Sequence, residues 1–291
     1  MIDATKCVIC GSNIRFLRKA LVAPFLARRI WNRSPFFVRL VHCETCGFMF
    51  YTPRLDAAEE NRLYADYRLQ EYQQMRQSSE PWYTPGFNAR LSSSESFEVR
   101  RQALCEILDE HIEKGRVKRV LDYGGDRGDL VAGLVEGAEA FVYDISGIPA
   151  VKGVNATGDP AGCKADLIVN SNVLEHVGFP REVVRQMILA APPGGLIFVE
   201  VPCESPLERA RMIRRVVQIG VTAIMRPALA VAVARPASLY MMHEHVNFFT
   251  EQVLTTLMRG CGCTVKAAGV YKVESPLGMG AMAWCLGTRD Q

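Results

Sequence analysis

A glycine-rich turn after a short apolar run is the feature that most constrains how this chain folds. Residues 120–128 read Val-Leu-Asp-Tyr-Gly-Gly-Asp-Arg-Gly, and a strand that ends in such a turn lets a ligand approach backbone N–H groups closely. Further apolar runs follow at residues 140–144, 166–171 and 196–201, separated by helical patterns at 128–136 and 181–190. This alternation predicts an α/β fold, a Rossmann-like and mostly parallel sheet of about seven strands with helices on both faces. At the end of the chain we expect a helix over 250–259 and a strand pair at 264–270 and 282–288.

Acidic residues around the turn indicate which cofactor it binds. Asp144 closes the next apolar run, twenty residues after Gly124, where an acid that binds both ribose hydroxyls is expected. Asp122 and Asp126 would repel the pyrophosphate of a dinucleotide but attract the sulfonium and ammonium groups of S-adenosylmethionine. We therefore predict S-adenosylmethionine rather than NAD as the cofactor. The candidate cofactor-binding residues are Asp122, Tyr123, Gly124, Gly125, Gly128, Asp144, Ile145, Asn170, Asn172 and Leu174.

Four of the ten cysteines form two closely spaced pairs near the N-terminus. Cys7 and Cys10 make the first pair and Cys43 and Cys46 the second, and this internal spacing suits four thiolates on one tetrahedral, structural zinc ion. The pairs are 32 residues apart, so the zinc would close the ends of a basic, hairpin-like excursion. Four buried free cysteines and a redox pair are the alternatives.

The net charge of +3 hides two strongly basic segments. Residues 11–43 contain seven Lys or Arg and no acid, and residues 205–240 contain six Arg and one Glu. The two segments carry +7 and +5, so the rest of the chain carries −9, which favours a local anionic partner. We hypothesise that both segments lie beside one acceptor pocket and bind a phosphate-bearing acceptor, the second through Arg211, Arg214 and Arg215.

The second basic segment is also apolar, and Pro227 should break it into two short helices. Such a pair is compatible with a lid over the active site, with a surface resting on an anionic membrane, or with a solvated pair packed on the core. A central Arg226 argues against a membrane-spanning helix. Because the start of the sequence lacks the pattern of a secretory leader, we expect the protein in the cytoplasm, including a peripheral position at the inner face of the membrane.

Changes of pattern along the chain predict its organisation. We expect a zinc-binding module with a basic insertion at residues 1–60, and connecting helices and a loop at 61–115, with residues 77–94 as a covering loop. The cofactor-binding domain would then span residues 116–291, with a helical insertion or lid at 203–242.

Several motifs together resemble a known family. The glycine turn, Asn170-Ser171-Asn172-Val173-Leu174-Glu175-His176-Val177, Pro193-Gly194-Gly195 and Glu244-His245-Val246-Asn247-Phe248-Phe249-Thr250 look like class I S-adenosylmethionine-dependent methyltransferases. With the cysteine pairs and Gly47-Phe48-Met49-Phe50, the chain is similar to the branch that has an N-terminal zinc-binding module. That branch includes sugar C-methyltransferases acting on nucleotide-linked deoxysugars, and the resemblance stops short of their C-terminal domain.

The resemblance implies roles for individual residues. Gly124, Gly125 and Gly128 would line the methionine portion of the cofactor, and Asp122 would orient its ammonium. His245 would be the general base and Glu244 its orienting partner or an alternative base, whereas His176 would position the acceptor.

The expected acceptor is a small, phosphorylated carbohydrate, such as a nucleotide-linked or lipid-linked sugar or a related glycan precursor, which would place the protein in carbohydrate biosynthesis. Two alternatives stay open. One is an RNA-binding or RNA-modifying methyltransferase that uses the zinc module and the basic insertions, and the other is a scaffold that binds the cofactor without turnover.

Overall fold

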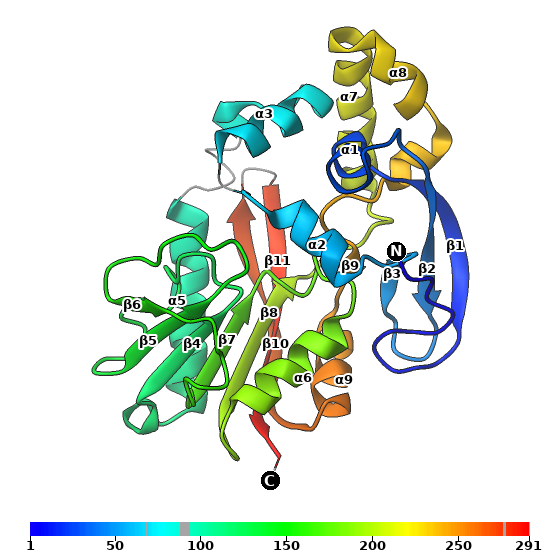
Figure 1. Ribbon diagram of the computed structural model, residues 1–291. Coiled ribbons are helices and arrows are strands. Elements are labelled where there is room, and N and C mark those ends of the chain that lie inside the picture. The colour runs from blue at the N-terminus through cyan, green and yellow to red at the C-terminus, as the bar shows by residue number, and fades with distance from the viewer. Residues whose placement is uncertain (68, 88–93, 276–277, 291) are drawn as a thin grey trace.

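The computed structural model describes residues 1–67, 69–87, 94–275 and 278–290, and its largest element is a seven-stranded sheet (Figure 1). Five neighbouring strands are parallel, β11 pairs antiparallel with β8 at their edge, and β10 pairs antiparallel with β11, so that β10 again runs in the direction of the five. This arrangement confirms the predicted α/β fold and the strand pair at the end of the chain. The strands in spatial order are β10 (Cys263–Ser275), β11 (Gly278–Arg289), β8 (Leu196–Pro202), β7 (Leu167–Ser171), β4 (Arg119–Tyr123), β5 (Glu139–Tyr143) and β6 (Val154–Ala156).

Helices cover both faces of this sheet, which explains why its central strands β4, β7 and β8 are mostly apolar and buried. Neighbouring residues of β4 point to opposite faces, so Val120 packs with residues of α5 (Ser94–His111) and Leu121 with residues of α6 (Pro180–Ala190) and α9 (Glu251–Gly260). Helix α9 begins where the sequence predicts, because the Thr250 side chain accepts a hydrogen bond from the Val253 amide.

Two local predictions are wrong in part. Residues 128–136 form consecutive turns rather than a helix, since Gly133 and Gly137 adopt left-handed φ angles of 65° and 74° that interrupt helical geometry. The start of the predicted 77–94 loop is helical as well, because α3 (Gln70–Ser79) extends to Ser79. Residues 88–93 of that loop lie outside the described residues.

The N-terminal region forms a second, antiparallel sheet that the sequence did not reveal. Strand β1 (Ile14–Leu21) pairs with β2 (Phe37–Cys43), β2 with β3 (Met49–Thr52), and β3 with the distant β9 (Asn247–Phe248). Helix α1 (Pro24–Trp31) connects the first two strands. Because β9 directly follows the Glu244-His245 motif, this sheet ties the N-terminal region to the residues expected to act on the acceptor.

The remaining helices form two groups, and the second lies at the top of Figure 1. Helix α2 (Ala57–Tyr64) begins at Asp56, whose side chain accepts from the Glu59 amide while Glu59 accepts from the Asp56 amide. The 203–242 segment folds as α7 (Arg209–Met225), α8 (Pro227–Val233) and η2 (Pro236–Tyr240), and a short turn, η1 (Lys114–Arg116), precedes β4. Among the helices in the described ranges, none is long and apolar enough to cross a membrane.

Candidate active site

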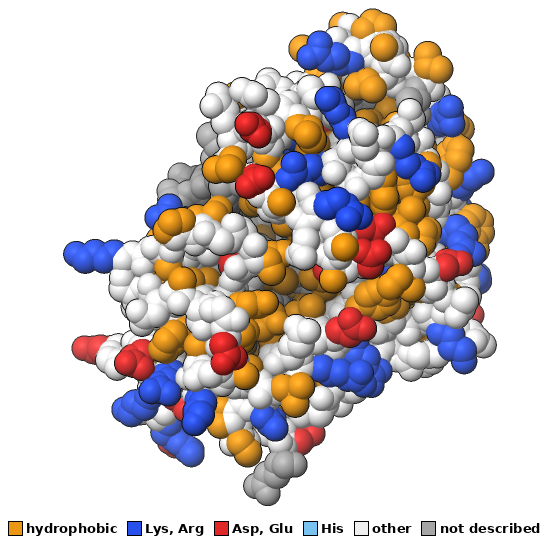
Figure 2. Space-filling model, in the orientation of Figure 1, with side chains coloured by type: hydrophobic (Ala, Val, Ile, Leu, Met, Phe, Trp, Pro, Cys, Tyr) orange, Lys and Arg blue, Asp and Glu red, His pale blue; other side chains and the backbone are white. Residues whose placement is uncertain are grey.

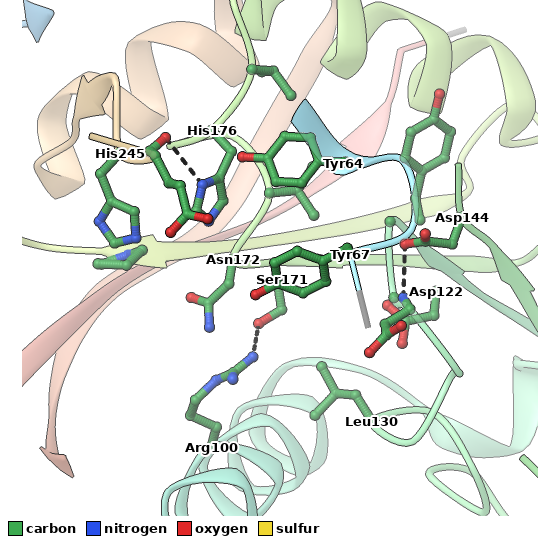
Figure 3. Close-up of a pocket in the computed structure, with 18 of the residues that line it drawn as sticks. Tyr64, Tyr67, Arg100, Asp122, Leu130, Asp144, Ser171, Asn172, His176 and His245 are labelled. Carbon is green, nitrogen blue, oxygen red and sulfur yellow. Dashed lines mark hydrogen bonds between the residues drawn. The ribbon is translucent and has the colours of Figure 1, made fainter. Parts of the chain in front are cut away.

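A wide cleft of about 2220 Å³ opens at the carboxyl ends of the parallel strands. Asp122 near the end of β4 and Asp144 directly after β5 lie at one end, and His176 and His245 lie at the other (Figure 3). Tyr64 of α2 closes the space between them from above. The volume exceeds the roughly 300–1,000 Å³ of an ordinary small-molecule pocket, so the cleft has room for two ligands side by side.

Backbone amides from the turns after β4 and β5 fix Asp144 as an acceptor of hydrogen bonds. Its Oδ2 accepts from the Asp126 amide at 2.9 Å, and its Oδ1 accepts from the Ser146 amide at 2.7 Å. Each carboxylate oxygen can accept more than one hydrogen bond, so both retain capacity for a ligand. Paired hydroxyl groups of a ribose fit this carboxylate.

Asp122 is the most unusual group at this end of the cleft. Its side chain is buried, and its Oδ2 has no hydrogen-bond partner among the described residues. Burial raises the pKa of Asp122 to about 7. Gly125 permits this placement, because a Cβ there would lie 1.9 Å from the Asp122 carboxyl carbon. A buried acceptor without a partner beside a glycine backbone suits a cofactor that brings its own donor, such as an ammonium group.

The other predicted cofactor residues divide into two groups. Those that line the cleft are Tyr123, Gly124, Ile145 and Asn172. Gly128, Asn170 and Leu174 lie behind the lining: Gly128 packs against Val142 and Val154, Asn170 donates to the Tyr123 carbonyl at 2.7 Å, and Leu174 is in the core. Asn170 thus joins the ends of β7 and β4, which brings the two halves of the cleft together.

His245 is paired with a carboxylate that the sequence analysis missed. Its Nδ1 lies 2.5 Å from Glu204 Oε1, and Glu204 also accepts from Arg211. Burial lowers the pKa of His245, but the charge and hydrogen bond of Glu204 outweigh it and raise the pKa overall. A histidine with one nitrogen fixed by a carboxylate is arranged as a general base, with Nε2 left to accept a proton.

Glu244 is held elsewhere, which corrects its expected role as the partner of His245. Its two oxygens accept from Arg76 at 3.0 and 2.8 Å, and Tyr72 donates to it at 3.0 Å. Burial raises the pKa of Glu244, but Arg76 and His243 lower it well below its usual value overall. The carboxylate is therefore ionised, and Arg76 and Tyr72 of α3 hold it in place. These hydrogen bonds connect α3 to the segment that carries His245.

His176 lies next to His245 at the acceptor end. The two ring centres are 4.8 Å apart with the ring planes at 82°, and the ring centre of Tyr64 lies 5.9 Å from that of His176. His176 Nδ1 lies 3.1 Å from the Glu244 carbonyl oxygen, so Nδ1 carries the hydrogen. Burial, followed by the charge of His245, lowers the pKa of His176 to about 3. A neutral ring suits the predicted positioning role.

The buried Arg54 links the end of the N-terminal sheet to the loop that follows His176. It donates to the Gly178 carbonyl at 2.7 Å, to the Val177 carbonyl at 3.0 Å and to the Asn247 side chain at 2.5 Å. Asn247 in turn donates to the carbonyls of Leu174 and Val177. The hydrogen bonds of Arg54 and Asn247 fix the loop that carries His176. Arg54 therefore supports the site although it lies outside the predicted cofactor-binding domain, residues 116–291.

On the opposite wall, α5 contributes Arg100, which the sequence analysis also missed. Arg100 donates to Glu200 at 3.1 Å and to the hydroxyl of Ser171, beside Asn172 (Figure 3). Arg54, Arg100 and Glu204 stand outside every motif, so only the folded chain reveals them.

The basic segments contribute less to the cleft than expected. Of the three arginines predicted to bind the acceptor, Arg214 lines the cleft, Arg211 is paired with Glu204, and Arg215 donates to Gln218 away from it. None of residues 11–43 lines it among the described residues. The hypothesis that both segments flank one pocket is therefore wrong, because β1 and β2 belong to the second sheet.

The four predicted zinc ligands come together. Cys7 and Cys46 have their sulfurs 3.7 Å apart, Cys10 and Cys43 3.5 Å, and all four lie within 4.8 Å of one another. Sulfurs around a tetrahedral zinc at about 2.3 Å would be about 3.8 Å apart. Both pairs are closed by the same turn, in which the following glycine amide donates to the first cysteine carbonyl. The donor set and its spacing fit zinc.

A second group of possible ligands lies at the acceptor end. Ligand atoms of Glu175, His176 and His245 are within 4.8 Å of one another, and both carboxylate oxygens of Glu175 are buried without a hydrogen-bond partner among the described residues. These atoms could hold a divalent cation. Coordination by His245 Nε2 would exclude its use as a base.

Comparison with known proteins adds a family assignment. A family described as "Methyltransferase domain" matches residues 97–268, more than half of the chain. No curated protein matches the sequence.

Solved structures give distant likenesses. The 1,6-didemethyltoxoflavin-N1-methyltransferase of Burkholderia thailandensis, with S-adenosylhomocysteine bound, is 14% identical over 87% of this chain and 96% of its own, with a TM-score of 0.49. The N-methyltransferase NodS of Bradyrhizobium japonicum WM9 is 16% identical over 67% and 97%, with a TM-score of 0.41. Magnesium protoporphyrin IX methyltransferase of Synechocystis PCC 6803 is 13% identical over 67% and 84%, with a TM-score of 0.44. We draw nothing about the acceptor from these likenesses.

Proposed function

The chain belongs to the methyltransferase-domain family and is an S-adenosylmethionine-dependent methyltransferase, and on this premise we propose that its acceptor is a small phosphorylated carbohydrate, either nucleotide-linked or lipid-linked. The observation that carries the proposal is one continuous cleft that joins the Asp122 and Asp144 end to the His245–Glu204 pair and includes Arg214 in its lining.

The residues proposed to hold the cofactor are those that line the acidic end. Asp144 takes the ribose hydroxyls, Asp122 faces the ammonium, and Gly124 and Gly125 leave room for the methionine portion. S-adenosylmethionine supplies an electrophilic methyl carbon with a good leaving group, so orienting the acceptor lowers much of the barrier.

His245 is the proposed general base at the other end. Its Nε2 takes the proton that the acceptor loses, and Glu204 stabilises the resulting imidazolium through Nδ1. His176, neutral and fixed by the Glu244 carbonyl, positions the acceptor beside it. The pairing with Glu204 favours this role over cation binding, because the carboxylate supplies the charge that the protonated ring needs.

Two cations among the residues that line the cleft support a phosphorylated acceptor. Arg214 and Lys272 both line the cleft, and arginine and lysine are the side chains that bind phosphate most effectively. The cleft is also large enough for a sugar nucleotide next to the cofactor.

We also propose that the zinc-binding module at residues 1–60 supports the acceptor site indirectly. Zinc on the four cysteines would fix the base of β2 and β3, and β3 pairs with β9 directly after His245. The proposed division keeps residues 61–115 as connecting helices and 116–291 as the methyltransferase domain, with the 203–242 insertion beside the acceptor.

The test measures formation of S-adenosylhomocysteine with three acceptor sets: nucleoside-diphosphate sugars, polyprenyl-phosphate-linked sugars and the same sugars without phosphate. We expect turnover only with the phosphorylated sets. Arg214→Gln should raise KM for them about tenfold or more, because a charge-assisted hydrogen bond contributes about 1.5–3 kcal/mol, and kcat should change little.

Arg209→Gln is the matched control, since Arg209 is exposed on the same helix and does not line the cleft. Equal turnover of sugars without phosphate, or an equal effect of Arg209→Gln, would overturn the proposed acceptor.

A further inference from the structure

A stripe of large apolar side chains lies on the solvent side of α7. Ile213, Val217 and Ile224 recur at helical spacing, and 65%, 60% and 82% of their surfaces are exposed. On a helix that packs against a soluble domain such a stripe faces the core. Here it faces water, and the one buried residue of the helix among those described is Thr222.

The stripe continues onto α8 and is surrounded by cations. Met225 at the end of α7 is 58% exposed and Val231 on α8 is 78% exposed. Arg226 lies between the two helices. Residues 209–243 contain six arginines and no acid. Figure 2 shows this apolar tip with basic side chains around it at the top of the molecule.

The N-terminal sheet extends the same surface. Phe37 is 40% exposed, with the Lys19 ammonium 4.2 Å from its ring centre and the Arg235 guanidinium 5.6 Å from it. Because β1 packs against η2, the basic residues of the two segments meet here. We define the docking surface as Lys19, Phe37, Ile213, Val217, Ile224, Met225, Arg226, Val231 and Arg235.

We propose that this docking surface binds an anionic lipid membrane. Apolar side chains that project from an acid-free, arginine-rich segment complement a layer with an apolar interior and negatively charged headgroups. The described helices are not built to span the layer, so the tip would insert at the interface and the arginines would contact headgroups.

The position of α7 gives this contact a consequence for the reaction. Ala210 and Arg214 near its start line the cleft, and its 17 residues extend about 25 Å at about 1.5 Å per residue. A membrane against this surface would therefore lie about one helix length from the acceptor end at Met225 and closer to it at Ile213. If the proposed function is correct, this geometry favours a lipid-linked sugar over a free sugar nucleotide, and membrane binding itself does not depend on that function.

The test is co-flotation of the full chain with vesicles of phosphatidylcholine alone or with phosphatidylglycerol added. We expect binding only to the anionic vesicles, weakened by salt. Ile224→Asp with Val231→Asp should weaken it tenfold or more. Arg226→Gln and Arg235→Gln should each weaken it about fivefold. Leu189→Asp is the matched control, because Leu189 is 70% exposed on α6, outside the docking surface.

Absence of binding to anionic vesicles would overturn the proposal, as would equal loss with Leu189→Asp. If the chain instead forms dimers that dissociate in Ile224→Asp, and does not bind vesicles, the surface binds a second copy of the chain. Calorimetric titration of every variant with S-adenosylmethionine separates the two proposals, since a variant defective only in docking keeps its affinity for the cofactor.

Discussion

Replacing Glu204 with Gln tests the assignment of His245 as the base and Glu204 as its partner. In the folded chain the pKa of His245 is raised, because Glu204 outweighs burial. Gln keeps an oxygen near Nδ1 but removes the negative charge, so burial then dominates. The pKa of His245 should therefore fall.

The size of the change follows from the contact. A hydrogen bond to a charged group contributes about 1.5–3 kcal/mol and a neutral one about 0.5–1.5 kcal/mol. The difference of about 1–1.5 kcal/mol corresponds to about one pKa unit. Stability follows the same sign: a raised pKa in the folded state stabilises below about pH 6.5, and this contribution is lost as pH rises through the folded pKa. Glu204→Gln should remove it.

Histidine ring signals followed by NMR against pH give the pKa directly, without an acceptor. The chain has five histidines, and His245→Gln identifies the relevant signal. Glu244→Gln is the control. Because Arg76 binds Glu244, this substitution should destabilise the fold without changing the pKa of His245. A His245 curve that stays in place in Glu204→Gln, or moves only in Glu244→Gln, would refute the pairing.

Three further predictions concern the cofactor end, the acceptor wall and the cysteines. Relative to the parent chain, His176→Asn should have a free energy of unfolding about 2–3 kcal/mol higher at pH 4.5 and little changed at pH 7. Denaturation of both proteins at both pH values measures this difference. The pKa of His176 is lowered to about 3, so in the parent chain this residue costs stability as pH falls below about 6.5. Gly125→Ala should abolish S-adenosylmethionine binding in calorimetry and destabilise by about 1–3 kcal/mol, whereas Gly158→Ala, with no atom within 4 Å of the added Cβ, should retain binding. Cys43→Ser should remove zinc measured by elemental analysis and lower the unfolding temperature, while Cys261→Ser should retain the metal.

The sequence predicted the main sheet well because its signals are local. Asp122, Gly124 and Gly125 are consecutive or nearly so, and each apolar strand is short and bounded by turn residues. The zinc-binding hypothesis rests on equally local spacing, and the structure brings the four sulfurs together.

The acceptor end was less predictable because its contacts join distant parts of the chain. Glu204 and His245 are 41 residues apart, and Arg76 and Glu244 are 168 apart. The resemblance assigned Glu244 as the partner of His245, yet adjacent residues in an extended segment point in opposite directions. Strand β9 was not predicted because it has only two residues, too few to show an alternating pattern.

The most direct test of the central claim, that the acidic glycine turn binds S-adenosylmethionine, is calorimetric titration of the metal-analysed protein. The ligands are S-adenosylmethionine and NAD, and Asp144→Ala is measured alongside. We predict binding of S-adenosylmethionine alone, weakened about 100-fold or more in Asp144→Ala, because hydrogen bonds to a charged carboxylate contribute about 1.5–3 kcal/mol each. Binding of NAD instead, or an unchanged affinity in Asp144→Ala, would contradict the account.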